Sequence, residues 1–145
     1  MPHFLVVDDS TVIRKVVRRI CEGLSFQVTE AEDGEQALAV CRETMPDGVM
    51  VDSSMPVMDG LEFLKSLRRM QGGDKPKVIF CLGKFAAELL VGAKGTIGGM
   101  RGTVYRYGDA KLLVTYHPAA CLRNPNYKRP VWEDLQLLAR EYQTP

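Results

Sequence analysis

The sequence predicts a doubly wound α/β fold, in which a mainly parallel sheet carries helices on both faces. Short apolar runs alternate with segments of helical periodicity along the whole chain, as expected where crossover helices join parallel strands. These runs are apolar at consecutive positions, which is typical of strands buried on both faces. A chain of 145 residues is long enough for one core of ordinary size, so we expect residues 1–145 to form a single domain.

The first part of the chain repeats the strand and helix pattern three times and ends in a fourth strand. Asp9 or Ser10 can cap the first helix, and the pair Gly72-Gly73 ends the third. Strands are expected at Phe4–Val7, Phe26–Thr29, Gly48–Val51 and Lys77–Leu82, and helices at Val12–Leu24, Gly34–Glu43 and Gly60–Met70.

The second part continues the alternation. A helix is expected at Lys84–Val91 and a glycine-rich loop at Gly92–Gly102, and a last helix is entered through Pro130. Two further runs have strand character, Thr103–Tyr107 and Lys111–Tyr116. We expect five strands in the sheet and leave open the place of the segment at residues 103–107.

Composition excludes several classes of protein. Hydrophobic residues at 46% and charged residues at 26% exclude a disordered chain. A net charge of +1 offers no whole-molecule field to attract nucleic acid or an anionic membrane. No apolar run is long enough to span a bilayer, and the chain lacks a signal-like start, so we expect a cytoplasmic protein without a membrane partner.

The four cysteines are Cys21, Cys41, Cys81 and Cys121, and no two of them have the spacing of metal ligands. We therefore expect reduced thiols without a functional role and no iron–sulfur cluster.

Carboxylates gather at the predicted carboxyl edge of the sheet. Asp8 and Asp9 follow the first expected strand and Asp52 follows the third, so these side chains should converge. Such a cluster favours a raised pKa on one member or a divalent cation such as Mg²⁺. The alternative, that Asp8 and Asp9 cap a helix and Asp52 merely ends a strand, has about equal weight on this pattern alone.

Three motifs of the first part resemble the response-regulator receiver family. They are Phe-Leu-Val-Val-Asp-Asp-Ser (4–10), Ala-Glu-Asp-Gly-Glu-Gln-Ala-Leu (31–38) and Val-Asp-Ser-Ser-Met-Pro-Val-Met-Asp-Gly (51–60). The resemblance covers residues 1–81 and implies a flavodoxin-like three-layer sandwich. It implies that Asp52 is the phosphoacceptor, that Asp8 and Asp9 hold Mg²⁺, and that the carbonyl of Ser54 is a further metal ligand.

Two positions depart from the pattern of that family. The family carries Ser or Thr at the end of the fourth strand, where this chain has Leu82-Gly83, and Lys-Pro at the end of the fifth, where it has His117-Pro118. His117 should therefore lie close to Asp52, where it would help to hold a softer divalent ion such as Zn²⁺.

Residues 82–142 resemble the C-terminal part of family 4 uracil-DNA glycosylases. That resemblance implies that His117 and Arg123 are remnants of a nucleic-acid site. The base pocket and cluster cysteines of that family are missing. The motifs are Leu-Gly-Lys-Phe-Ala-Ala-Glu-Leu-Leu-Val-Gly (82–92), Met-Arg-Gly-Thr-Val-Tyr (100–105), Val-Thr-Tyr-His-Pro-Ala (114–119), Leu-Arg-Asn-Pro (122–125) and Trp-Glu-Asp-Leu (132–135).

The two resemblances meet at Leu82 without a linker, and the composition changes there as well. Residues 1–82 carry a charge of −3 and residues 83–145 a charge of +4, and all five tyrosines lie in the second part. This contrast predicts an engineered chimera of two fold fragments, 1–81 and 82–145, in which the second fragment completes the sheet of the first. We expect this chimera to have neither signalling nor glycosylase activity.

Two alternatives to the chimera stay open: a Mg²⁺-binding phosphoacceptor module, and a weak DNA-binding or glycosylase remnant. We expect a non-enzyme that requires no cofactor and no obligatory partner, and for which nucleic acid is not a partner. We expect a monomer whose exposed strand edge offers a route to dimers.

Overall fold

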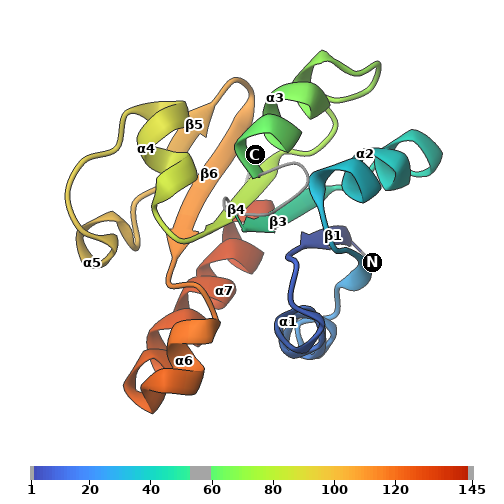
Figure 1. Cartoon of the computed structure of the whole chain (residues 1–145). Helices are drawn as coiled ribbons and strands as arrows, with labels where there is room; N and C mark the ends of the chain where they lie inside the picture. The colour runs from blue at the N-terminus through green and yellow to red at the C-terminus, as the bar shows by residue number, and fades with distance from the viewer. Residues whose placement is uncertain (1, 53–59, 144–145) are drawn as a thin grey trace.

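The computed structural model describes residues 2–52 and 60–143, with the backbone only at residues 85 and 86. Strands and helices alternate as predicted from residue 3 to residue 91, after which a short helix, two consecutive strands and the last helices follow (Figure 1). The strands are β1 (His3–Val7), β2 (Gln27–Ala31), β3 (Gly48–Asp52), β4 (Val78–Leu82), β5 (Tyr105–Tyr107) and β6 (Ala110–Thr115). The α-helices are α1 (Thr11–Gly23), α2 (Gly34–Glu43), α3 (Gly60–Arg69), α4 (Phe85–Val91), α5 (Ile97–Met100), α6 (Ala119–Arg123) and α7 (Lys128–Gln143), and a 3₁₀ turn, η1 (Pro125–Tyr127), precedes the last of them.

The strands form one sheet in the order β2-β1-β3-β4-β6-β5. All neighbouring pairs are parallel except β5 and β6. The predicted doubly wound, mainly parallel fold is thus confirmed, with one strand more than the five expected. The additional strand arises because a tight turn at Gly108, whose φ is 58°, folds β5 back along β6.

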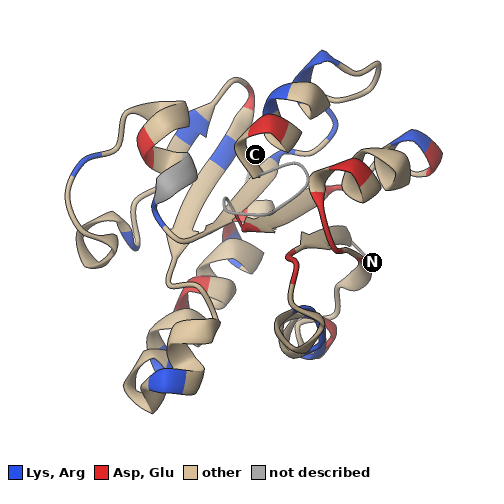
Figure 2. Ribbon diagram, viewed as in Figure 1, with Lys and Arg blue, Asp and Glu red and all other residues tan. Residues whose placement is uncertain are grey.

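Helices cover both faces of the sheet and bury a separate apolar layer on each. Along β1, Leu5 and Val7 pack with residues of α2 and α3, whereas Phe4 and Val6 pack with residues of α1 and α7. This alternation follows from the two-residue period of a strand, and it explains why consecutive positions are apolar. Charged residues lie mainly on the helices and connecting loops (Figure 2).

The sheet continues without interruption across Leu82, where the composition changes. β4 and β6 pair in register from Val78 with Lys111 to Leu82 with Thr115. Leu112 and Leu113 of β6 are buried, one in each apolar layer. The second part of the chain therefore supplies side chains to both halves of the core.

Helix starts and ends follow local capping. The Ser10 hydroxyl accepts a hydrogen bond from the Ile13 amide and starts α1, and the Asp33 carboxylate accepts one from the Gln36 amide and starts α2. Within the glycine-rich segment predicted as a loop, Thr96 caps the single turn of α5. None of the helices within residues 2–52 and 60–143 is long and apolar enough to cross a bilayer.

If the chain is one cooperative unit, truncation of a β6 side chain should destabilise the whole fold. Leu112 is fully buried, so we expect Leu112→Ala to lower the free energy of unfolding by about 2–5 kcal/mol. Urea unfolding followed by circular dichroism should still show one transition. Leu89→Ala, at a side chain that is 56% exposed, is the control and should change stability by less than about 0.5 kcal/mol. Two separate transitions would contradict a single domain.

Candidate functional site

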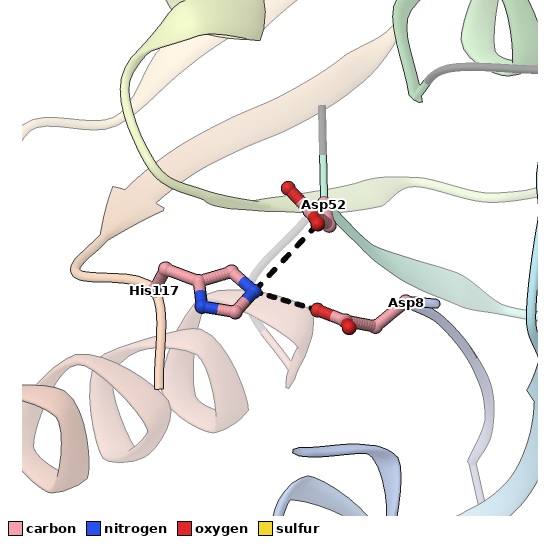
Figure 3. A group of neighbouring side chains, drawn as sticks. All are labelled: Asp8, Asp52 and His117. Atoms are coloured by element: carbon pink, nitrogen blue, oxygen red, sulfur yellow. Dashed lines mark hydrogen bonds and ion pairs between the residues drawn. The ribbon is translucent and has the colours of Figure 1, made fainter. Parts of the chain in front are cut away.

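Three side chains meet at the carboxyl edge of the sheet. Asp8 follows β1, Asp52 ends β3, and His117 comes two residues after β6. One ligand atom of each lies within 4.8 Å of the others (Figure 3). The strands β1, β3, β4 and β6 are parallel, so their carboxyl ends bring together residues that are up to 109 positions apart.

Asp8 is the innermost member of this site, and its side chain is fully buried. One carboxylate oxygen accepts the Ser10 amide at 2.8 Å, and the other lies 2.6 Å from His117 Nε2. The Arg14 guanidinium donates to the backbone carbonyl of Asp8 at 2.7 Å. A buried carboxylate is costly without partners, and these contacts hold both the side chain and its backbone in place.

The ring of His117 is fixed at both nitrogens. Its Nδ1 accepts the backbone N–H of Ala119 at 3.1 Å. In the neutral ring the proton therefore sits on Nε2, which donates to Asp8. The same Nε2 lies 3.7 Å from Asp52 Oδ2. His117 thus presents an N–H donor to the space between the two carboxylates.

The carboxylates also change the acidity of the ring. Burial by itself lowers the pKa of His117, but the hydrogen bond to Asp8 and the charges of Asp8, Asp52 and Asp9 outweigh burial and raise the pKa above its ordinary value. The hydrogen bond from the Ala119 N–H favours the neutral ring and so opposes this rise of the pKa, because it requires an Nδ1 without a proton. The negative charge of the site is thereby offset in part by a side chain of the protein itself.

The donor set decides which metal ions the site would accept. The carboxylates of Asp8 and Asp52 fit a hard cation such as Mg²⁺, which is commonly held by one or two carboxylates and several waters. A softer ion such as Zn²⁺ would use His117 as well, and the predicted proximity of His117 to Asp52 is present. Coordination by Nε2 would require its proton to move to Nδ1 and would break the bond from Ala119. The geometry therefore favours oxygen ligation.

The other predicted site residues lie elsewhere. Asp9 is exposed and does not belong to the cluster of Asp8, Asp52 and His117. Its charge nevertheless contributes to the raised pKa of His117. Arg123 is exposed at the end of α6. Ser53 and Ser54 lie outside the described residues, so the predicted metal ligand at the Ser54 carbonyl stays a prediction.

Leu82 and Gly83 stand where the receiver pattern has a hydroxyl residue, and Gly83 has a special backbone conformation. Its φ is 99°, a conformation that L side chains rarely adopt, and its amide donates to the carbonyl of Thr115 at 2.9 Å. The glycine therefore lets the chain leave β4 while it stays bonded to the end of β6.

Sequence reasoning missed two contributors to the site. Arg14 is buried within an otherwise apolar helix face, and its only sequence signal is that an arginine there must find acceptors. The Ala119 amide acts because α6 begins there. The first turn of a helix has free N–H groups, and this helix was not predicted.

The sequence model of the family described as the response regulator receiver domain matches residues 4–105 of this chain. This match covers more than half of the chain. The chain belongs to the response regulator receiver family. The Asp8 and Asp52 cluster thus lies at the carboxyl edge of a receiver sheet.

Individual relatives agree with this assignment. Response regulator MprA of Mycolicibacterium vanbaalenii is 35% identical over 90 residues, which is 62% of this chain and 38% of that protein. The chain thus spans about two fifths of the length of that relative. The low-pH crystal structure of the chemotaxis protein CheY4 of Vibrio cholerae is 30% identical, with a TM-score of 0.57, and the match covers 87% of this chain and 97% of the other.

A receiver domain of a sensor histidine kinase from Pseudomonas aeruginosa is also similar. It is 26% identical with a TM-score of 0.55, and the match covers 61% of this chain and 71% of that one. Its structure has a magnesium ion coordinated in the active site cleft.

These comparisons overturn the interpretation as an engineered chimera. The receiver match runs from residue 4 to residue 105 and so crosses the expected boundary at Leu82. The related proteins are natural response regulators, and none of the comparisons supports a glycosylase segment or a designed origin. The prediction was wrong because short motifs and a change in composition are weaker evidence of origin than one family match that runs across Leu82.

A side chain at position 83 should be costly. We expect Gly83→Thr to lower the free energy of unfolding by roughly 1–2 kcal/mol, because the left-handed region disfavours a Cβ. Gly23→Thr is the control, since Gly23 has open space and an ordinary φ. Chemical denaturation of both variants measures the difference, and equal stability of the two would show that Gly83 carries no conformational requirement.

The ion cluster around Arg14, whose guanidinium bonds the Asp8 carbonyl, should make the free energy of unfolding depend on pH. Arg14 also bonds Glu30, which Lys15 and Arg18 contact as well. Burial raises the pKa of Glu30, but the hydrogen bonds from Lys15, Arg18 and Arg14 outweigh it and hold the pKa below its ordinary value of 4.5. The stabilisation is therefore present above pH 4.5 and is lost as the pH falls through the lowered folded value.

We expect Glu30→Gln to reduce the loss of stability between pH 5 and pH 3, as measured by thermal unfolding at each pH. The exposed Glu35→Gln is the control. An unchanged pH profile in Glu30→Gln would show that this ion cluster does not cause the loss of stability at low pH.

Proposed function

We propose that this domain accepts a phosphoryl group on Asp52. The observation that carries the proposal is the position of Asp52 at the carboxyl edge of a receiver sheet, beside the buried Asp8. Receiver domains bind Mg²⁺ at an acidic site. The curated relatives are longer than this chain, so the activity of any full-length protein is part of this proposal as well.

The proposed reaction uses a carboxylate oxygen of Asp52 as the nucleophile. The oxygen attacks the phosphorus of a small phosphodonor, a new O–P bond forms, and the bond to the leaving group breaks with its electron pair on that group. Asp8 and Asp52 would hold the Mg²⁺, which supplies positive charge against the phosphoryl oxygens when it is bound. Asp9 and the Ser54 carbonyl stay predicted ligands. The domain is itself the acceptor and turns over no separate substrate.

His117 would donate a hydrogen bond to the phosphoryl group in this reaction. Its Nε2–H points into the space between Asp8 and Asp52, and Nδ1 is held by the Ala119 amide. A donor that is fixed before the reaction can meet the charge on a phosphoryl oxygen without reorganisation. The neighbouring carboxylates raise the pKa of His117, because their attraction outweighs burial. Nε2 carries a proton in the neutral ring held by Ala119 as well as in the charged ring, so it can donate in either form.

The phosphoacceptor assignment can be tested by intact mass spectrometry. Incubation with acetyl phosphate and Mg²⁺ should add one phosphoryl group to the protein. Asp52→Asn should abolish the gain, and removal of Mg²⁺ with a chelator should reduce it. The matched control is Asp74→Asn at an exposed aspartate, which should leave the gain unchanged. A gain that persists in Asp52→Asn would contradict the proposal.

The role of His117 can be tested separately. We expect His117→Ala to slow phosphorylation by roughly 10-fold to 100-fold, less than the 10²–10³ lost with one oxyanion-hole donor, because the His117 side chain is 27% exposed to water. His117→Lys, which returns the residue of the receiver pattern, should recover most of the rate. Equal rates in the alanine variant and the unmodified protein would remove His117 from the reaction.

A further inference from the structure

An apolar cavity lies on the face of the sheet that α1 and α7 cover, away from α2, α3 and α4. Its volume is about 310 Å³, within the range of small-molecule pockets. Phe80 and Leu82 of β4 form part of its lining, together with residues of α1, α6 and α7. The cavity thus reaches from the protein surface down to the sheet.

The cavity is bordered by apolar side chains that remain in contact with water. Leu122 and Trp132 line it and are 65% and 41% exposed. Val12 is 61% exposed and lies one helical turn before Val16, which also lines the cavity. Three of the four large apolar residues that are exposed in the described part of the chain are therefore on this face. A ligand that covers them would gain free energy from the apolar area removed from water.

The charge that borders the cavity is positive. Lys128 is the only charged residue among those that line it, and its side chain is exposed. A lysine commonly lays its aliphatic stem along an apolar surface and keeps its ammonium in water. The cavity therefore combines an apolar interior with a positive group at its border.

We propose that this cavity binds an anionic amphiphile, with its apolar chain between α1 and α7 and its carboxylate on Lys128. An apolar cavity of about 150 Å³ takes up benzene, so 310 Å³ has room for a chain of roughly twelve carbons. The depth down to the sheet favours a slender ligand over a helix laid across the surface. This site is separate from Asp8 and Asp52, and the proposal does not depend on phosphorylation.

Two side chains in the cavity wall are suitable reporters. Trp132 is the only tryptophan of the chain, so quenching of its fluorescence reports on this site alone. Cys121 is the half-buried thiol, whereas Cys21, Cys41 and Cys81 are buried. Its alkylation, located by peptide mass spectrometry, should therefore be selective.

The experiment titrates the full chain with ω-bromododecanoate below its micelle concentration. We expect saturable quenching of Trp132, since the bromine quenches on contact, and slower alkylation of Cys121 over the same range of concentration. Dodecanoate should compete with the brominated ligand. Dodecanol, which lacks the charge, should compete two- to fivefold more weakly, in keeping with a surface ion pair.

Variants separate the charge from the cavity. Lys128→Glu should weaken binding by at least two- to fivefold, whereas Lys65→Glu, the same change at an exposed lysine of α3, should not affect it. Val17→Phe, which adds volume in the cavity wall, should abolish quenching by the ligand. Because Lys128 is exposed, its variant keeps the test valid even if Val17→Phe fails to fold.

Three results would overturn the proposal. The first is quenching that does not saturate or leaves Cys121 unprotected. The second is equal weakening by Lys128→Glu and Lys65→Glu. The third is a stable dimer in size-exclusion chromatography in which Trp132 and Cys121 are already shielded without ligand, since a second copy of the chain would then be the occupant.

Discussion

The buried carboxylate of Asp8 is the constraint around which the site is built. A fully buried charge must be compensated inside the protein, and Asp8 obtains its compensation from the Ser10 amide and from His117. Ser10 also caps α1, and Arg14 of the same helix holds the Asp8 carbonyl. The start of α1 and the chemistry of the sheet edge are therefore coupled through Asp8.

The contact between His117 and Asp8 exists only because the second part of the chain completes the sheet. β6 lies parallel to β4, which places its carboxyl end beside those of β1 and β3. His117 then reaches Asp8 and Asp52, which lie in the first part of the chain (Figure 3). The change in composition at Leu82 marks no boundary in the hydrogen bonding, because β4, which lies before it, pairs with β6, which lies after it, from Val78 with Lys111 to Leu82 with Thr115.

Much of this arrangement could be predicted from the sequence. Consecutive apolar residues such as Phe4 to Val7 indicate a buried parallel strand, and Asp52 at the end of such a strand must lie at the carboxyl edge. The partner of His117 was harder to identify. Proximity to Asp52 was predicted, but the shorter contact is to Asp8, because strand order places carboxyl ends together without fixing the direction of a ring. The role of Arg14 and the turn of α6 depend on tertiary contacts that no local pattern contains. The origin of the second part was misjudged for a related reason, since motifs of a few residues are weaker evidence than a continuous family match.

The most direct test of this account is the protonation state of the two ring nitrogens of His117, measured by long-range ¹H–¹⁵N NMR at a pH where the ring is neutral. The account predicts a proton on Nε2 and a bare Nδ1 that accepts the Ala119 amide, and a weaker preference in Asp8→Asn, where only the Ala119 amide still selects this tautomer. A ring whose proton resides on Nδ1, or whose tautomers are indifferent to Asp8, would contradict it.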